Sequence, residues 1–282
     1  MKLALLLLLP ALLFAATPAA SAPFAYAADG DTSGGNAKLY RIDLANNTLS
    51  EVGVLAGVEQ LEALSFGPGG ILYGYEDVNK RLVRINTATA AVTVIGSIGV
   101  AGDADDPGMA FCPDNQTMYL LTEQGNLYTI NLSTAAATLV GNGGDYGPTG
   151  LSCDRSGVLY AVSDDTNSLY TVNRVNGAST LIGPLGKSIS DAGLAHDGTR
   201  LLMVYDEGGT TRLWQLNTST GAATPIATLI TGTEISLESL ALDIEAAPPV
   251  VQPIPTLSEW MMMLLAGLIG IVAFGSLRRR MY

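Results

Sequence analysis

The stretch Leu39-Tyr40-Arg41-Ile42-Asp43 is the first of five similar short segments that decide the fold. The other four are Leu82-Val83-Arg84-Ile85-Asn86, Leu127-Tyr128-Thr129-Ile130-Asn131, Leu169-Tyr170-Thr171-Val172-Asn173 and Leu213-Trp214-Gln215-Leu216-Asn217. Their first residues are 43, 45, 42 and 44 positions apart. A spacing this regular indicates an internal repeat of one structural unit.

Three further apolar runs accompany each segment. One run opens the unit, a second precedes the segment, and a third follows it after a turn rich in Asn, Thr, Ser and Ala or Gly; in the second unit these runs are 61–66, 71–75 and 91–95. Four short strands every 42 to 45 residues, separated by Gly, Asn, Asp and Pro turns, are typical of a β-propeller blade. We therefore predict an all-β, five-bladed β-propeller of four-stranded blades over residues 23–247.

The two ends of the repeat region predict how the ring closes. The first unit has three strands, near 24–28, 38–43 and 48–55, and lacks the opening strand. A lone run at 237–244 matches the missing type. We expect this C-terminal strand to pair with the first unit, because closure covers sheet edges that would otherwise invite aggregation.

The repeated pattern Leu-Tyr-x-Ile/Val-Asn, followed by Thr-Gly-Ala-x-Thr-x-Ile-Gly, resembles uncharacterised bacterial extracytoplasmic propellers. The resemblance spans most of the repeat region. It implies the propeller fold and carries no activity, since one fold hosts many functions.

Charge is distributed unevenly along the chain. Side chains are 48% hydrophobic and 14% charged overall, against about a quarter charged in an ordinary soluble domain. The apolar excess lies at the two ends, whereas residues 28–247 hold 25 of the 26 acidic and 10 of the 14 basic residues, a net charge of −15. We expect no nucleic-acid partner, because no basic stripe is present to neutralise phosphates.

The N-terminus has the pattern of a secretory signal peptide at residues 1–22. Lys2 is followed by an apolar run to Leu13 and by Ala20-Ser21-Ala22, which fits a small-x-small cleavage site. An uncleaved anchor is the alternative, but this apolar run is shorter than the ~20 residues that span a bilayer.

The C-terminus predicts a membrane helix at about 257–277, preceded by a stiff Pro-rich spacer at 248–253. Arg278, Arg279 and Arg280 follow at once. By the positive-inside rule they hold the C-terminus in the cytoplasm and leave the acidic region outside the inner membrane.

A sorting motif precedes this predicted helix. Ile254, Pro255, Thr256, Leu257, Ser258, Glu259 and Trp260, then the apolar helix, then the arginines of the predicted tail, resemble the IPTL-type C-terminal sorting signal of Gram-negative bacteria. The resemblance implies membership of the wider PEP-type group, whose partner is an exosortase-like membrane peptidase that passes the protein to the cell surface. Met261 departs from the pattern, which usually has Gly after the Trp.

Residues that could support catalysis are few. His196 is the one histidine, and it falls at the end of an opening strand where the other units have Phe66, Cys112, Cys153 and Leu242. We interpret it as structural. No phosphate-binding Gly loop, zincin pattern or Gly-x-Ser-x-Gly elbow is present, so we expect no enzyme activity.

The two cysteines, Cys112 and Cys153, fall at the ends of the opening strands of neighbouring units, in what we take to be the same position. Opening strands lie closest to the propeller axis, which places the two cysteines side by side. In an exported protein such a pair is expected to oxidise, so we predict a disulfide between blades; two buried free thiols are the alternative.

Acidic residues concentrate in the loops that open on one face of the predicted propeller. These are Asp29, Asp31, Glu59, Glu62, Glu76, Asp77, Asp103, Asp105, Asp106, Glu123, Asp145, Asp164, Asp165, Asp191, Asp206, Glu207, Glu234 and Glu238. Among them Glu62, Asp106, Asp191 and Glu238 are predicted to ring the channel mouth and are candidate ligands for Ca²⁺, which prefers oxygen. Solvated turn residues are the alternative, since Asp is favoured in turns; no other cofactor is expected.

Two function classes follow. The preferred one is a non-enzymatic binding or structural module of the bacterial envelope, exported across the inner membrane and then anchored there or sorted to the surface. The alternative is a metal-dependent propeller hydrolase or lactonase with carboxylates at the channel mouth. The ligand of the propeller is not indicated by the sequence.

Overall fold

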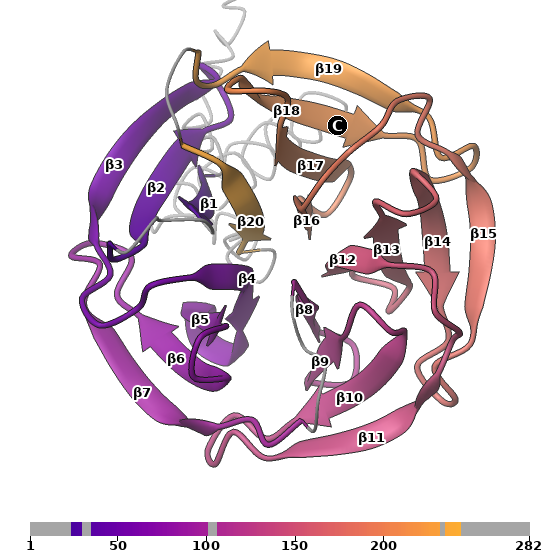
Figure 1. The fold of residues 1–282 in the computed structure, drawn as a ribbon, viewed down its shortest axis with the longest axis horizontal. Helices are drawn as coiled ribbons and strands as arrows, with labels where there is room; N and C mark the ends of the chain where they lie inside the picture. The colour runs from indigo at the N-terminus through magenta and orange to yellow at the C-terminus, as the bar shows by residue number, and fades with distance from the viewer. Residues whose placement is uncertain (1–23, 30–34, 101–105, 232–234, 244–282) are drawn as a thin grey trace, which may run out of the picture. The chain divides into compact units, whose positions relative to one another are not determined.

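The computed structural model describes residues 24–29, 35–100, 106–231 and 235–243. They form five four-stranded antiparallel sheets arranged around a common axis, as Figure 1 shows. The predicted all-β, five-bladed propeller is confirmed. Among the described residues the one helical element is a short 3₁₀ turn, η1 (Pro68–Gly70).

Strands run outward from the axis in chain order within each blade. The blades are β4 (Leu61–Gly67), β5 (Ile71–Glu76), β6 (Arg81–Ile85) and β7 (Val92–Ser97); β8 (Gly108–Cys112), β9 (Thr117–Leu121), β10 (Asn126–Ile130) and β11 (Ala137–Asn142); β12 (Pro148–Cys153), β13 (Leu159–Ser163), β14 (Ser168–Val172) and β15 (Ser179–Pro184); and β16 (Ala192–His196), β17 (Leu201–Asp206), β18 (Thr211–Leu216) and β19 (Ala223–Thr228).

The fifth blade joins the two ends of the ring. Its order is β20 (Leu237–Leu242), β1 (Phe24–Asp29), β2 (Lys38–Asp43) and β3 (Thr48–Val54). The predicted closing strand is therefore present as β20, and it pairs antiparallel with β1 (Figure 1). The pairing covers the edges of both strands within one sheet.

The repeated Leu-Tyr segment has a structural reason, because it is the third strand of every blade and contains a β-bulge. In all five blades the register between the third and fourth strands shifts directly after the Leu, as at Leu127 and Leu169. The residue opposite that Leu is Gly in four blades, and a Cβ at Gly141 or Gly183 would collide with backbone of the turn in the next blade. The Ile-Gly part of the repeat thus allows neighbouring blades to pack closely.

The residue that ends each repeated segment, Asn in four units and Asp43 in the first, builds the turn to the fourth strand. The Asn86 side-chain oxygen accepts hydrogen bonds from the backbone N–H groups of Ala88 and Thr89, and Asn217 forms the same pair of bonds with its own turn. Such Asx turns explain why Asn recurs there. The turn needs a positive φ at its fourth residue after the Asn, which Gly221 supplies with φ 82°.

The hydrophobic core is divided into five clusters, each between two neighbouring blades. The innermost strands are buried on both faces, as in β12, whose six residues are all buried. The fourth strands are largely exposed, as in β7 and β19. The axis is therefore lined by residues with little contact with solvent, and the polar residues found there require an explanation.

Two compact units are distinguished by their internal contacts, Met1–Ile244 and Glu245–Tyr282. In the part of the chain that the structure describes, no helix has the length and apolarity that a membrane crossing requires. The predicted signal peptide (1–22), spacer (248–253) and membrane helix (257–277) lie outside the described residues and stay predictions.

Candidate functional site

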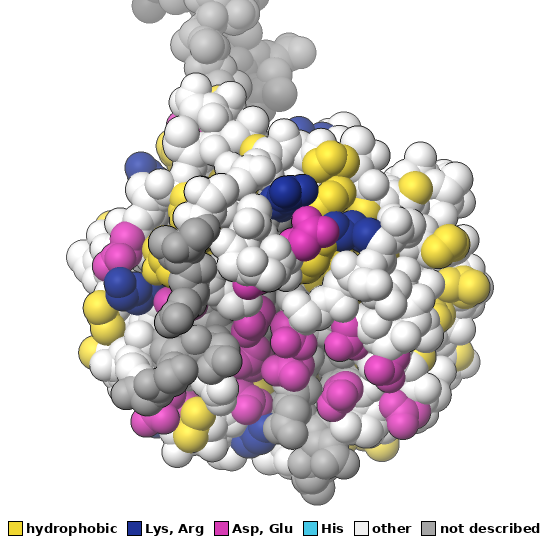
Figure 2. Space-filling model, turned by 45° about the horizontal axis from the view of Figure 1, so that its top comes forward, with side chains coloured by type: hydrophobic (Ala, Val, Ile, Leu, Met, Phe, Trp, Pro, Cys, Tyr) yellow, Lys and Arg dark blue, Asp and Glu magenta, His cyan; other side chains and the backbone are white. Residues whose placement is uncertain are grey.

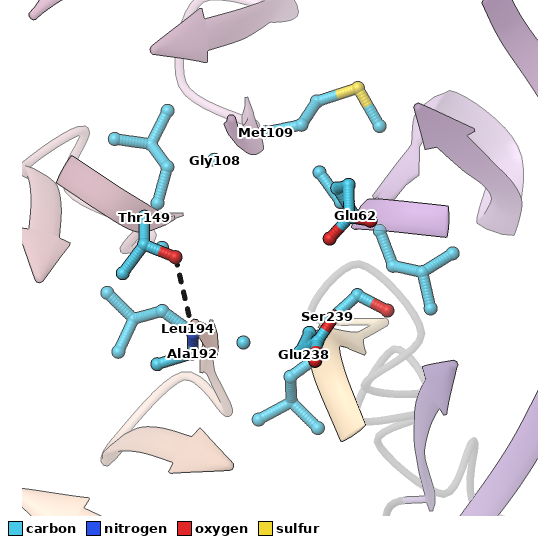
Figure 3. A pocket seen from close by; sticks show the side chains of 14 residues that line it. Glu62, Gly108, Met109, Thr149, Ala192, Leu194, Glu238 and Ser239 are labelled. Carbon is cyan, nitrogen blue, oxygen red and sulfur yellow. Dashed lines mark hydrogen bonds between the residues drawn. The ribbon is translucent and has the colours of Figure 1, made fainter. Parts of the chain in front are cut away.

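The mouth of the central channel is built by the first residues of the innermost strands β4, β8, β12, β16 and β20. Glu62 and Glu238 occupy equivalent positions in neighbouring blades, since in both strands the register to the next strand shifts at this residue. Thr149 has the same position in β12. A bulged residue leaves the regular ladder, which re-aims its side chain. Figure 3 shows the Glu62 carboxylate pointing toward the channel axis.

The channel is closely packed just below this mouth. A Cβ added at Gly150 would lie 2.5 Å from the carbonyl oxygen of Ala192, and one at Gly193 would lie 2.5 Å from the backbone nitrogen of Leu240. The innermost strands are also joined by the Thr149 hydroxyl, which accepts a 3.3 Å hydrogen bond from the Ala192 N–H (Figure 3). What remains at the mouth is a shallow recess of about 170 Å³, a volume that includes open solvent.

Glu62 is the acidic residue most removed from water at this mouth. Its exposed fraction is 6%, and no hydrogen bond or ion pair reaches it from the described residues. Burial first, and then the negative charges of Glu238, Asp106, Asp77 and Asp191, raise its pKa from 4.5 to about 9.

The four predicted ligands thus interact with one another. Asp106 and Asp191 each precede by one residue the position that corresponds to Glu62 in their own blade, where β8 and β16 have no bulge, and both act on the Glu62 charge. Within the described ranges, however, no three carboxylates have oxygen atoms within 4.8 Å of one another. The one group of three potential ligands found there contains both cysteines, which are bonded to each other. The carboxylates at the mouth therefore lie near one another but do not form a complete metal-coordination site.

Acidic side chains gather around the hollow of this face, as Figure 2 shows. Some of them have basic partners: Lys80 Nζ lies 2.6 Å from Asp77, and Lys187 lies 3.3 Å from Glu207. Of the acidic residues predicted for this face, Asp31, Asp103, Asp105 and Glu234 lie outside the described residues.

A buried ion pair beside the mouth was not predicted from the sequence. The Glu76 side chain is fully buried, accepts a 2.7 Å hydrogen bond from Arg81 Nε and also accepts hydrogen bonds from Asn79. We expected Glu76 to be one more acidic residue of the face. Only the cross-strand register, which places Glu76 opposite Arg81, reveals the pair.

A second unpredicted cluster lies in the β16–β19 blade. Lys187 Nζ is 3.6 Å from the ring centroid of Trp214 and 4.4 Å from that of Tyr205. Burial lowers the pKa of Lys187, while Glu207 opposes this change. The Lys187 ammonium group makes cation–π contacts with both rings and an ion pair with Glu207. These contacts stabilise the blade.

The two cysteines form a disulfide between the β8–β11 and β12–β15 blades, with their Cα atoms 5.2 Å apart. The expected equivalence of their positions is wrong by one residue. Cys153 pairs with Leu159, and the corresponding pair in the preceding blade is Phe111 with Met118, so Cys112 lies one residue further on.

This offset has a geometric reason. Successive residues of a strand point to opposite faces, and two neighbouring blades confront each other with opposite faces. Two cysteine side chains in the same strand position would both point the same way around the ring, and they would not face each other. They face each other only if one is shifted along its strand by an odd number of residues.

His196 lies at the far end of β16 from the mouth. Its Nδ1 accepts a 2.9 Å hydrogen bond from the Gly198 N–H, and burial lowers its pKa. The nearby acidic residues Asp154 and Asp197 partly counter this effect. The contacts are those of a turn-supporting residue, in line with the structural interpretation.

The structure is that of a closed five-bladed propeller with an acidic recess at one end of its central channel. Comparisons with known proteins also identify a sorting signal in the chain. Residues 252–280 match the IPTL-CTERM motif. Residues 25–154, which include the strands β2 to β12 and all of β1 except Phe24, match a family described as "Repeat of unknown function (DUF6923)". The predicted sorting signal and repeat are therefore both identified, although the motif residues Ile254 to Trp260 and Arg278 to Arg280 lie outside the described part.

A comparison with curated proteins finds no match. Among solved structures, one from a crystal of the nidogen/laminin complex is similar with a TM-score of 0.53 and 13% identity, over 78% of this chain and 97% of that chain. Virginiamycin B lyase from Staphylococcus aureus has a TM-score of 0.45 and 13% identity, over 71% and 69%. A protein of unknown function from Bacteroides thetaiotaomicron has a TM-score of 0.49 and 18% identity, over 78% and 62%. The first likeness supports the fold, and none assigns a function.

Proposed function

We propose that this chain is an exported, non-enzymatic β-propeller that is sorted through its C-terminal signal and acts as a binding module of the bacterial envelope. The observation that carries the proposal is the position of the IPTL-CTERM motif, which follows a propeller already closed by β20. Such an order separates a rigid binding domain from a signal that can be removed without opening the ring.

The sorting route follows from the chemistry of the tail. An apolar segment at 257–277 anchors the exported chain in the inner membrane, and Arg278 to Arg280 keep the C-terminus in the cytoplasm. An exosortase-like membrane peptidase then acts near Ile254 to Trp260 and releases the propeller toward the cell surface.

Binding is favoured over catalysis by the geometry of the propeller. The recess measures about 170 Å³ even with open solvent included, so it encloses far less space than the ~300–1,000 Å³ of pockets that hold drug-sized ligands. His196, the one candidate general base of its type, lies at the other end of its strand and is engaged with Gly198. A metal-dependent hydrolase or lactonase would need a converged ligand set, and among the described residues no three carboxylates have oxygen atoms within 4.8 Å of one another.

Fractionation of cells that express the protein tests this proposal. We expect the wild-type propeller to be found at the surface or in the medium with a mass reduced by the tail. A variant with Pro255→Ala and Thr256→Ala should stay in the inner membrane at a higher mass, while the spacer variant Pro249→Ala should behave as wild type. Equal mass and location for the wild type and the motif variant would refute sorting through this signal.

A further inference from the structure

The charge at the channel mouth differs from the charge at the opposite end of the propeller. At the opposite end, Arg174 forms two hydrogen bonds with Asp114, at 2.8 and 2.9 Å, and Arg200 Nε lies 2.6 Å from Asp197. Around the mouth, the charged neighbours that act on Glu62 are all acidic. A source of positive charge other than these side chains is therefore required if Glu62 is ionised.

Nearby basic residues are engaged elsewhere. Arg81 is committed to the buried Glu76, and Lys80 to Asp77. In the described part of the chain, the ion pairs found on this face leave the Glu62 carboxylate without a basic partner. A carboxylate buried to this degree and left without a partner costs several kcal/mol when it is charged.

The position of Glu62 is imposed by the fold. It lies on a bulge of β4, and the equivalent bulge of β20 presents Glu238 from the neighbouring blade, so both carboxylates reach the same recess (Figure 3). The fold also accepts an apolar residue at this position, because Ala192 occupies it in β16. Two carboxylates held at one level around the axis indicate a recess that accepts positive charge.

The size of the recess restricts what can enter. The enclosed part of the recess has room for about one water molecule, and the rest of its volume of about 170 Å³ includes open solvent, so most organic ligands are too large for it. The close backbone packing at Gly150 and Gly193 holds neighbouring innermost strands together beside it. A ligand of this recess must therefore be a small cation that is coordinated by oxygen atoms.

We propose that the recess binds one Ca²⁺ ion between the carboxylates of Glu62 and Glu238, with Asp106 and Asp191 adding negative charge at the rim. Ca²⁺ takes about 6–8 oxygen ligands in flexible geometry and accepts water among them, which suits a site that is not preassembled. The expected affinity is that of extracellular calcium modules, with a Kd of about 10⁻⁴–10⁻³ M. The site adds a ligand to the proposed binding module and does not depend on how the chain is sorted.

The test uses the full chain in detergent, stripped of metal with EDTA and then dialysed free of it. The thermal midpoint is measured with rising CaCl₂ against NaCl of matched ionic strength, and calcium binding is measured by calorimetry. We expect 10 mM CaCl₂ to raise the wild-type midpoint by about 3–11 °C relative to NaCl. The Glu62→Gln and Glu238→Gln variants should each lose at least ~10-fold in calcium affinity and most of the shift.

Glu123→Gln is the matched control, because Glu123 is an exposed acid on the same face. It should keep the wild-type calcium shift. The proposal is overturned if the wild type shows neither heat nor a shift, if Glu62→Gln responds as wild type does, or if Glu123→Gln loses the response equally, which would indicate general charge screening. Since Glu62→Gln replaces the carboxyl group with an amide of the same shape, loss of binding in that variant cannot be assigned to misfolding when its own midpoint is unchanged or raised.

Discussion

Loss of the disulfide should weaken the ring at the junction of the β8–β11 and β12–β15 blades. The perturbation is the double substitution Cys112→Ala and Cys153→Ala, which removes the bond and keeps small apolar side chains in the cluster between these blades. Both cysteines are buried, with exposed fractions of 0% and 4%. The bond is thus part of the core that joins two blades.

The magnitude follows from the length of chain that the bond closes. The two cysteines are 41 residues apart. In the chain-entropy treatment, a loop of that length restricts the unfolded chain by about 4 kcal/mol at 25 °C. For a domain of about 150–250 residues, 1 kcal/mol corresponds to about 2–4 °C, so the midpoint of thermal unfolding should fall by about 8–16 °C.

The assay is thermal unfolding of the full chain in detergent, followed by circular dichroism. Because reductant cannot reach the buried bond in the folded state, the wild type is first reduced in urea and refolded with reductant present. Reduction should lower the wild-type midpoint toward that of the double variant. The double variant itself should be insensitive to reductant, which separates the bond from other effects of the reagent.

Two outcomes would contradict this reasoning. One is a wild-type midpoint that does not change on reduction. The other is an alkylation pattern, measured as an electrophoretic or mass shift after denaturation, that is the same with and without reductant, since that would mean that both thiols are free.

Three further substitutions probe the mouth and its surroundings. Gly150→Ala should lower the free energy of unfolding by about 1–3 kcal/mol, measured by urea unfolding, because its Cβ would meet the Ala192 carbonyl at 2.5 Å; an unchanged midpoint would show that the strands can separate. Arg81→Met should cost about 3–5 kcal/mol, because it leaves the buried Glu76 charge unpaired, and adding Glu76→Gln should restore part of the loss in the same assay. Glu62 has a folded-state pKa raised to about 9, so the stability of the protonated group is present below pH ~4.5 and is lost as the pH rises toward 9. In EDTA, the free energy of unfolding of Glu62→Gln should therefore exceed that of the wild type at pH 7 and match it near pH 4; a pH-independent difference would exclude this titration.

The repeat could be predicted from sequence because each part of it has a local cause. Asn86 and its counterparts form turns through their own side chains, and the repeated segments combine buried apolar residues with an exposed one, as Arg84 lies between the buried Val83 and Ile85. The closing strand could be predicted because one strand was missing from the first unit. These features need only neighbours in the chain and one rule about sheet edges.

The candidate site could be predicted in part. Alignment of the opening strands was enough to place Glu62 and Glu238 at equivalent positions, which the bulges in both strands support. Alignment could not show that Glu62 is 6% exposed or that Arg81 turns to Glu76 instead. Burial and partner choice depend on atoms contributed by several blades, and a single unit of sequence does not contain them.

The sequence by itself determined the number of blades, the order of strands, the closure by β20 and the presence of a sorting signal. Each of these features is visible in the sequence as a regular repeat or as a motif. Tertiary structure alone decided how deeply Glu62 is buried, that Arg81 pairs with Glu76, and how the cysteines meet. Cys112 and Cys153 show the reason: strands were aligned by their ends, but the two residues face each other because neighbouring blades present opposite faces, which requires an offset of one. Contacts between blades follow the direction of side chains in space, and that direction is set only when the ring has closed.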